Sequence, residues 1–182
     1  MPDLIVIYGP PLAGKSTVAR LLGAAMPERT AIVSTDYLLN QAITRPDRDR
    51  RAELELVHQQ LRLLVANYLK FQYHCIVEGP FVFELDGGVA NYEAHIDQLL
   101  ALMRMMTLRK MIVRLSASGE ELARRAEQTA REAELALALR IEDAYKVRAA
   151  AELRSFNTGA HTAEEIVASI LEELPGMPRG QA

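Results

Sequence analysis

The most constraining feature of the 182-residue sequence is the segment Gly9–Ser16, which reads GPPLAGKS and matches the pattern G-x-x-x-x-G-K-[ST] in full. The apolar run Leu4–Tyr8 precedes it, and a segment of alternating apolar and polar residues follows it. A strand, a loop containing glycine and a helix in this order wrap consecutive backbone N–H groups around a concave space. The segment therefore predicts a loop that cradles phosphate groups.

The residue types in this loop have physical reasons. Gly9 and Gly14 permit the tight curl and keep side chains out of the path of the phosphate oxygens. Lys15 supplies a positive charge for the β- and γ-phosphates of a nucleotide. Ser16 offers a hydroxyl to Mg²⁺ and opens a helix whose N-terminal dipole faces the anion. We therefore expect Lys15 to be a catalytic residue and Ser16 to be a metal ligand.

Apolar runs and helical periods alternate along the chain, which is typical of βαβ units. The predicted strands are Leu4–Tyr8, Thr30–Ser34, His74–Gly79, Lys110–Leu115 and Arg154–Thr158. The predicted helices are Ser16–Met26, Asp49–Phe71, Val89–Met106 and Thr162–Leu174. Helical sequence that can contain a break is also expected from Ser118 to Glu152. We expect an α/β fold of the P-loop NTPase type, with about five parallel strands and helices on both faces.

Length and composition fit one domain. We expect it over residues 1–174, with a helical lid around residues 118–152 and a flexible tail over residues 175–182. The formal net charge of −3 argues against a dedicated nucleic-acid-binding protein. The one cysteine lies in an apolar stretch, and no apolar run reaches about 18 residues. These features predict a cytoplasmic protein without a membrane segment.

Two carboxylates follow predicted strands at the sheet edge where the phosphate loop lies. Asp36 comes just after Thr30–Ser34, and Glu78 closes His74–Gly79. A carboxylate at this edge can accept the proton of an attacking hydroxyl or hold Mg²⁺. The alternatives are a helix N-cap for Asp36 and a solvated strand end for Glu78. Both remain candidates for the catalytic base.

Two groups of arginines are candidates for binding anions. Arg45, Arg48, Arg50 and Arg51 precede the second predicted helix and could grip an anionic substrate. Arg124, Arg125 and Arg131 follow the fourth predicted strand and could cover a transferring phosphoryl group from a lid. The alternative for both groups is a solvated helix surface with ion pairs to nearby glutamates.

The sequence resembles the small P-loop kinases in five blocks, which read LIVIYGPPLAGKSTVARLL, IVSTDYL, CIVEGPF, MIVRLSASGEELARRA and RSFNTGAHTAEEIVASI. This group includes the nucleoside-monophosphate-kinase-like, shikimate/gluconate-kinase-like and chloramphenicol-phosphotransferase-like enzymes. The blocks span most of the chain, and the first is the specific one. The resemblance implies ATP and Mg²⁺ as cofactors.

The resemblance also implies roles for individual residues. Asp36 matches the acidic residue that serves those kinases as base or substrate anchor, and Arg125 matches the arginine that opens the lid. Asn157 and Thr158 match the segment that passes the adenine. The residues that would bind the phosphates are Gly9, Pro10, Pro11, Leu12, Ala13, Gly14, Lys15, Ser16 and Thr17.

Together these observations predict an ATP-dependent, Mg²⁺-dependent kinase. It would transfer the γ-phosphoryl group to a hydroxyl or phosphate of a small metabolite, nucleoside or nucleotide, with Asp36 and Ser16 at the metal. The sequence leaves open the acceptor, the choice between ATP and GTP, and a monomer or a homodimer. A nucleotide-dependent switch without an acceptor and a polynucleotide 5′-end kinase are the alternative functions.

Overall fold

The computed structural model of the chain describes residues 1–26, 29–43, 50–85, 88–102, 104, 106, 108–145 and 153–174. Its centre is a sheet of five strands in the order β2-β3-β1-β6-β7, and every neighbouring pair is parallel. The strands are β1 (Asp3–Tyr8), β2 (Thr30–Ser34), β3 (His74–Gly79), β6 (Arg109–Ser116) and β7 (Leu153–Asn157). The predicted five-stranded parallel sheet is thus confirmed, with strand ends within one residue of the prediction.

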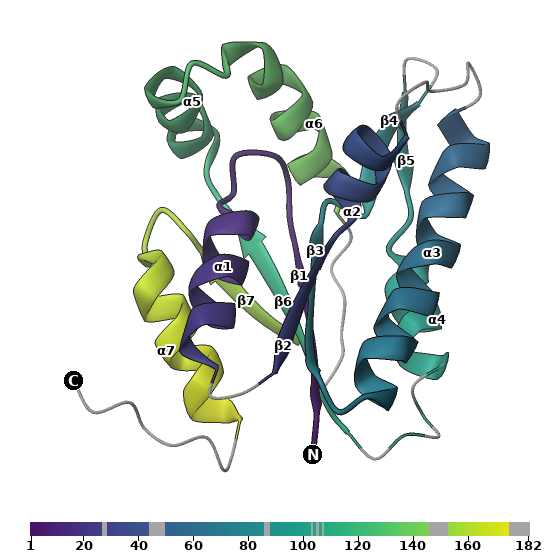
Figure 1. Ribbon diagram of the computed structural model, residues 1–182. Helices are drawn as coiled ribbons and strands as arrows, with labels where there is room; N and C mark the ends of the chain where they lie inside the picture. The colour runs from purple at the N-terminus through teal and green to yellow at the C-terminus, as the bar shows by residue number, and fades with distance from the viewer. Residues whose placement is uncertain are drawn as a thin grey trace.

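Helices cover both faces of this sheet (Figure 1). One face carries α1 (Lys15–Ala25) and α7 (Ala163–Glu173), and the other carries α3 (Arg50–Lys70) and α4 (Ala94–Leu102). A capping box formed by Thr162 and Glu165 opens α7, at the residue where the sequence predicted that helix to begin. None of the helices in the described ranges combines the length and the apolar character needed to cross a membrane.

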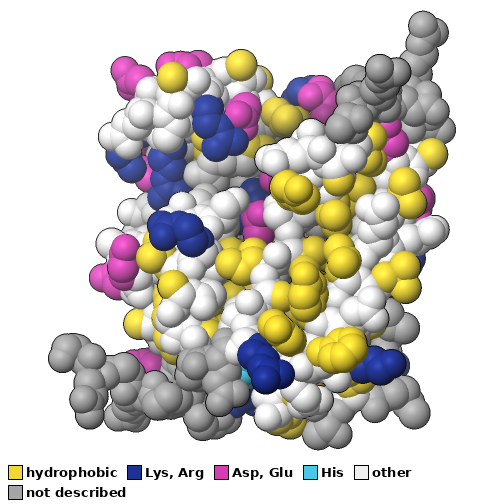
Figure 2. Space-filling model, viewed as in Figure 1, with side chains coloured by type: hydrophobic (Ala, Val, Ile, Leu, Met, Phe, Trp, Pro, Cys, Tyr) yellow, Lys and Arg dark blue, Asp and Glu magenta, His cyan; other side chains and the backbone are white. Residues whose placement is uncertain are grey.

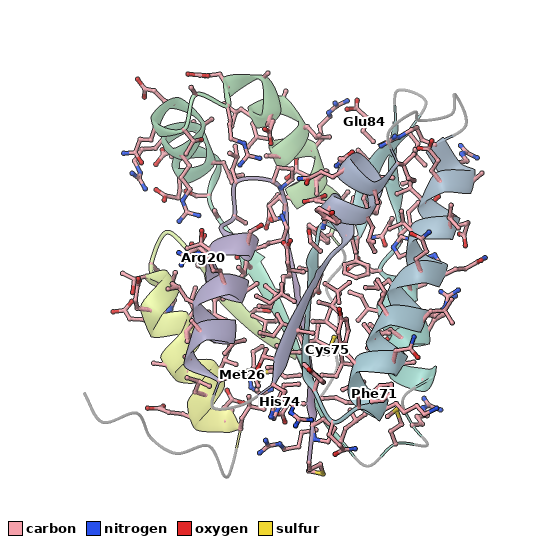
Figure 3. All side chains as sticks on the ribbon, in the orientation of Figure 1. Arg20, Met26, Phe71, His74, Cys75 and Glu84 are labelled. Atoms are coloured by element: carbon pink, nitrogen blue, oxygen red, sulfur yellow. The ribbon has the colours of Figure 1, made fainter. Side chains whose placement is uncertain are left out.

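Alternate residues of β1 divide the core into two parts. Leu4 and Val6 pack with the buried side of α3, whereas Ile5 and Ile7 pack with α1 and α7. This is the pattern of a strand buried on both faces, and it explains the continuous apolar run in the sequence. Cys75 lies in the core beside α3 (Figure 3). Burial raises the pKa of its thiol to about 12, so this residue does not act as a nucleophile at neutral pH.

Two helices lie beyond the carboxyl ends of the strands, in the segment that the sequence predicts to be a lid, and we call them the lid (Figure 1). They are α5 (Gly119–Gln128) and α6 (Leu135–Ala144), and a 3₁₀ turn at Glu132–Glu134 joins them. The hydroxyl of Ser118 accepts a hydrogen bond from the backbone N–H of Glu121 and thereby caps α5. The last part of the predicted lid, residues 146–152, and the predicted tail lie outside the described residues.

The prediction of one helix over Val89–Met106 is wrong. Its first part is a strand, β5 (Gly88–Asn91), which pairs antiparallel with β4 (Val82–Leu85), and the helix α4 begins only at Ala94. The side-chain oxygen of Asn91 accepts a hydrogen bond from the backbone N–H of Glu93 at 2.9 Å, which turns the chain between strand and helix. The apolar spacing alone does not register this turn.

A short helical segment follows β2 directly, at the carboxyl end of that strand. It consists of α2 (Thr35–Tyr37), which continues as a π-helical turn over Leu38–Ala42. The hydroxyl of Ser34 caps α2 by accepting a hydrogen bond from the backbone N–H of Tyr37. This segment, the lid and the β4–β5 ribbon lie at the same end of the molecule as the phosphate loop (Figure 1).

Candidate functional site

The loop between β1 and α1 has the curled backbone that the sequence predicted. Leu12 and Gly14 adopt positive φ angles of 66° and 85°. Gly9 packs directly on β6, because a Cβ atom placed there would lie 2.2 Å from the backbone oxygen of Leu115. The N-cap of α1 is Gly14, and no side chain caps it. The N-terminal end of α1 thus has backbone N–H groups available for an anion.

Lys15 lies at the base of this loop with only 6% of its surface exposed. Its ammonium group donates a hydrogen bond to the backbone oxygen of Pro10 at 2.8 Å. Burial lowers the pKa of Lys15, and the nearby carboxylates of Asp36 and Glu78 counteract that shift. A phosphate in the cradle would also favour the charged ammonium group, because opposite charges attract strongly where water is excluded.

A cleft with a volume of about 1140 Å³ opens in front of the loop. Residues from the loop, α2, α3, the β4–β5 ribbon, the lid and the start of α7 line it. Figure 2 shows basic side chains gathered where the lid meets the body of the molecule. The predicted site residues that line the cleft are Pro11, Leu12, Ala13, Gly14, Lys15, Ser16, Thr17, Asp36, Arg50, Arg124, Arg125, Arg131 and Thr158.

The remaining candidates lie elsewhere. Gly9 and Pro10 form the arm of the loop behind the cleft, and Glu78 lies behind Ser16. Asn157 is outside the cleft lining, and its side-chain oxygen accepts a hydrogen bond from the backbone N–H of Gly159. Arg45 and Arg48 lie outside the described residues.

The two carboxylates approach the loop from neighbouring elements. Asp36 is in the first turn of α2, and Ser34 rather than Asp36 is the N-cap. Burial raises the pKa of Asp36, Lys15 lowers it, and Glu78 raises it further. A carboxylate with a raised pKa is a better proton acceptor for a hydroxyl than an ordinary one.

Glu78 is buried, with 4% of its surface exposed, so it is not a solvated strand end. Its carboxylate accepts a hydrogen bond from the hydroxyl of Ser16 at 3.2 Å. The end of β3 packs tightly on α2, because a Cβ atom at Gly79 would lie 1.6 Å from the hydroxyl oxygen of Thr35. This packing holds Glu78 and Asp36 on adjacent segments beside the loop.

Oxygen donors gather where a metal ion would meet the phosphates. They are the hydroxyl of Ser16 and the carboxylates of Glu78 and Asp36, which are the ligand types that Mg²⁺ takes. Within the ranges that the structure describes, no group of three or more His, Cys, Asp or Glu side chains could hold a metal by itself. This donor set fits Mg²⁺, which usually has few protein ligands and is completed by phosphate oxygens and water.

Arg125 connects three segments around the mouth of the loop. One terminal nitrogen of its guanidinium group donates to the backbone oxygen of Leu12 at 3.1 Å and to the hydroxyl of Thr158 at 3.0 Å. The other donates to the backbone oxygen of Thr158 at 2.6 Å, and the Nε atom donates to Glu121. The lid, the phosphate loop and the segment after β7 are therefore joined through one planar side chain.

The other two lid arginines have partners within the lid. Arg124 donates to Glu121 and Gln128, and it is an exposed neighbour of Arg125. Arg131 forms an ion pair with Glu134 at 2.5 Å. Hydrogen bonds from Arg124 and then from Arg125 lower the pKa of Glu121 to about 2, so this carboxylate stays charged at neutral pH.

Arg125 and its neighbour Arg124 allow a first prediction with a matched control. Replacing Arg125 with lysine removes the forked contacts to Leu12 and Thr158, because an ammonium group cannot reproduce that planar geometry. We expect the affinity for Mg²⁺–ATP, measured by calorimetry, to fall about tenfold, which is the equivalent of one charge-assisted hydrogen bond. The variant Arg124→Lys is the control and should bind like the wild type. Equal affinities for both variants would show that Arg125 does not order the loop.

The sequence did not indicate the apolar part of the cleft lining. Leu39, Phe83, Leu85 and Leu137 lie in three different segments and have the spacing of ordinary core residues. No local pattern distinguishes them from the residues that pack under the sheet, because their proximity arises from the folding of the lid and the ribbon. Glu121, which orients both arginines, was likewise missed as a site residue.

A parallel sheet, a curled loop at the tip of its central strand and a lid define the fold of the small P-loop kinases. Consistent with this class, the sequence profile of an AAA domain family matches residues 4–151, and the chain belongs to that family. No curated protein sequence matches the chain.

Solved structures of kinases share the fold at low sequence identity. The APS kinase CysC of Mycobacterium tuberculosis, solved with AMPPNP and APS, has a TM-score of 0.71 and 12% identity over 95% of this chain and 97% of its own. A gluconokinase of Sinorhizobium meliloti has a TM-score of 0.60 and 18% identity over 95% of each chain. Thymidylate kinase of Candida albicans has a TM-score of 0.56 and 17% identity over 95% of this chain and 91% of its own.

Proposed function

We propose that the protein is a kinase that transfers the γ-phosphoryl group of ATP, with Mg²⁺, to a small-molecule acceptor. The observation that carries this proposal is that Lys15, the open end of α1 and Asp36 line one cleft. An anion cradle alone would suit any nucleotide-binding protein. A half-buried carboxylate with a raised pKa in the same cleft provides the second half of a phosphoryl transfer.

Each residue has a role in the proposed transfer. Backbone N–H groups of the loop and Lys15 hold the β- and γ-phosphates, and Ser16, assisted by Glu78, binds the metal ion. The acceptor oxygen attacks the γ-phosphorus, the bond to the β–γ bridging oxygen breaks, and ADP leaves. Asp36 takes the proton of an attacking hydroxyl. Bound Mg²⁺ neutralises charge on the phosphate oxygens.

Arginines of the lid supply the remaining positive charge. Arg125 already contacts the loop, and Arg131 lines the cleft near Asp36, with which it interacts electrostatically. Closure of the lid over a bound nucleotide would exclude water from the transferring group. An arginine in this position can accelerate phosphoryl transfer by about 10³- to 10⁵-fold.

The replacement Asp36→Asn tests the assignment of the base. The amide keeps the shape but cannot accept the proton, so we expect acceptor-dependent ADP release to fall about 10²- to 10⁴-fold. The affinity for Mg²⁺–ATP should fall much less than the rate, since the loop and Lys15 hold the phosphates and Asp36 is only one of the oxygen donors near the metal. In the wild type the rate should also fall as the pH is lowered through the raised pKa of Asp36, because the protonated carboxyl is no base.

The exposed carboxylate of Asp97 on α4, on the far side of the molecule, provides the control Asp97→Asn. That variant should match the wild type in both rate and affinity. Unchanged acceptor-dependent turnover in Asp36→Asn would overturn Asp36 as the base and leave Glu78 as the candidate. ADP release that no acceptor stimulates would instead favour a nucleotide-dependent switch or an ATPase.

A further inference from the structure

Beyond the phosphate loop, the cleft continues between α2, α3, the β4–β5 ribbon and α6, and we call this part the acceptor half. Six apolar side chains line it, namely Leu39, Leu54, Val82, Phe83, Leu85 and Leu137, and the polar side chains of Asn40, Glu84 and Glu134 line it as well. Leu137 is half-buried, whereas the other five are buried beneath the surface of the cleft. Asp36 stands between this half and the loop, so an acceptor placed here would have its reacting oxygen beside the proposed base.

The described basic side chains around the acceptor half already have acidic partners. Arg50 forms an ion pair with Glu53 at 2.8 Å, and Arg131 forms one with Glu134 at 2.5 Å. At the rim, Arg140 of α6 pairs with Glu84 of the ribbon at 2.5 Å, and Figure 3 shows Glu84 at this end of the molecule. An acceptor with a phosphate or carboxylate group would meet the carboxylates of Glu53, Glu84 and Glu134 beside these arginines, and like charges disfavour that arrangement.

We propose that the acceptor is an uncharged molecule with an apolar body and a hydroxyl group. This inference rests on the proposed phosphoryl transfer and specifies the substrate class of the same site. The apolar body would contact the hydrocarbon side chains that line the acceptor half, with Leu137 as the most exposed of the six. The hydroxyl would face Asp36, lose its proton to that carboxylate and form the new bond to phosphorus.

A comparison of acceptors tests the proposal directly. ADP release from Mg²⁺–ATP is measured with 3-phenyl-1-propanol and cyclohexylmethanol as uncharged apolar alcohols. Gluconate and AMP serve as anionic acceptors, and glucose serves as an uncharged polar one. We expect at least tenfold stimulation over the acceptor-free rate by at least one of the apolar alcohols and less than twofold by the other three compounds. The phosphorylated alcohol should appear in equal amount to ADP.

Two substitutions on α6 provide a matched pair of variants. Leu137→Arg places a charge in the acceptor half, whereas Leu139→Arg places the same charge on an exposed position outside the cleft lining. We expect the first to lower kcat/KM for the stimulating alcohol at least tenfold and the second to leave it within twofold. Leu137→Gln, which is uncharged and similar in size, should fold normally and still lower kcat/KM about threefold. All three variants should bind Mg²⁺–ATP like the wild type.

The outcomes separate this inference from the proposed function. Stimulation by gluconate or AMP but by neither alcohol overturns the inference and leaves the kinase assignment standing. Binding of Mg²⁺–ATP with no stimulation by either alcohol also overturns it. A wild-type protein that does not bind Mg²⁺–ATP in calorimetry overturns the proposed function and the inference together. Equal kcat/KM in Leu137→Arg and Leu139→Arg overturns the placement of the acceptor.

Discussion

Replacing Lys15 with alanine is expected to lower the rate of acceptor-dependent ADP release by about 10³-fold. The ammonium group of Lys15 is buried at the base of the loop and is positioned by the backbone oxygen of Pro10. Arg125 also bonds to the loop, but it donates to Leu12 from the lid, so it does not replace the charge of Lys15 at the base of the loop. One preorganised charged or hydrogen-bonding group raises the rate by about 10²- to 10³-fold in a site that excludes water. Lys15 would act on the negative charge that develops on the γ-phosphate during transfer.

The control for this variant is Lys70→Ala, which removes an exposed lysine at the end of α3. It should leave both the rate and the affinity for Mg²⁺–ATP unchanged. Calorimetry should show weaker binding of Mg²⁺–ATP to Lys15→Ala, and urea unfolding should show that the variant is folded. If Lys15→Ala retained the wild-type rate while binding ATP, the loop would not be the site of phosphoryl transfer.

The second large effect concerns stability. Gly9→Ala is expected to lower the free energy of unfolding by about 3 kcal/mol in urea denaturation, which is the upper range for overpacking a rigid site. A Cβ atom at Gly9 would lie 2.2 Å from the backbone oxygen of Leu115 in β6. Because that oxygen belongs to the backbone, either β6 or the loop must shift to make room. Gly9 also has a φ of 156°, a conformation that residues with a Cβ atom rarely adopt.

The glycine at the start of β5 provides the comparison. A Cβ atom at Gly88 would meet an ordinary contact, the backbone oxygen of Leu85 at 3.7 Å. Gly88→Ala should therefore change the free energy of unfolding by less than about 1 kcal/mol. If Gly9→Ala also changed the free energy of unfolding by less than about 1 kcal/mol, the loop would not be packed tightly against β6. A measurable loss of ATP affinity in Gly9→Ala should accompany its loss of stability.

Much of the fold was predictable because it is encoded in short segments. The central strand β1 was located from a continuous apolar run, since a strand buried on both faces must be apolar at every position. The weakest of the five segments, RSFNT, is mostly polar, and it forms the edge strand β7. The long helix α3 was located from its apolar period, and the capping box at Thr162 marked the start of α7. The helix expected over Val89–Met106 failed because β5 and α4 share an apolar spacing that only the turn at Asn91 divides.

The candidate site was predictable only in part. The loop residues and the two carboxylates were identifiable, because parallel strands bring their carboxyl ends to one edge. The hydrogen bond between Ser16 and Glu78 was not, since 62 residues separate the partners. The residues alone left the roles of Arg124, Arg125 and Arg131 undecided, and only the resemblance to the small P-loop kinases singled out Arg125.

The sequence by itself determined the phosphate cradle and the alternation of strands and helices around it, because both depend on neighbours a few residues apart. Only the tertiary structure decided which arginine reaches the loop, that Glu78 lies behind Ser16, and that apolar side chains line the acceptor half. Those properties depend on how the lid and the β4–β5 ribbon fold back over the sheet. Such contacts join residues that are distant along the chain, and no local spacing records them.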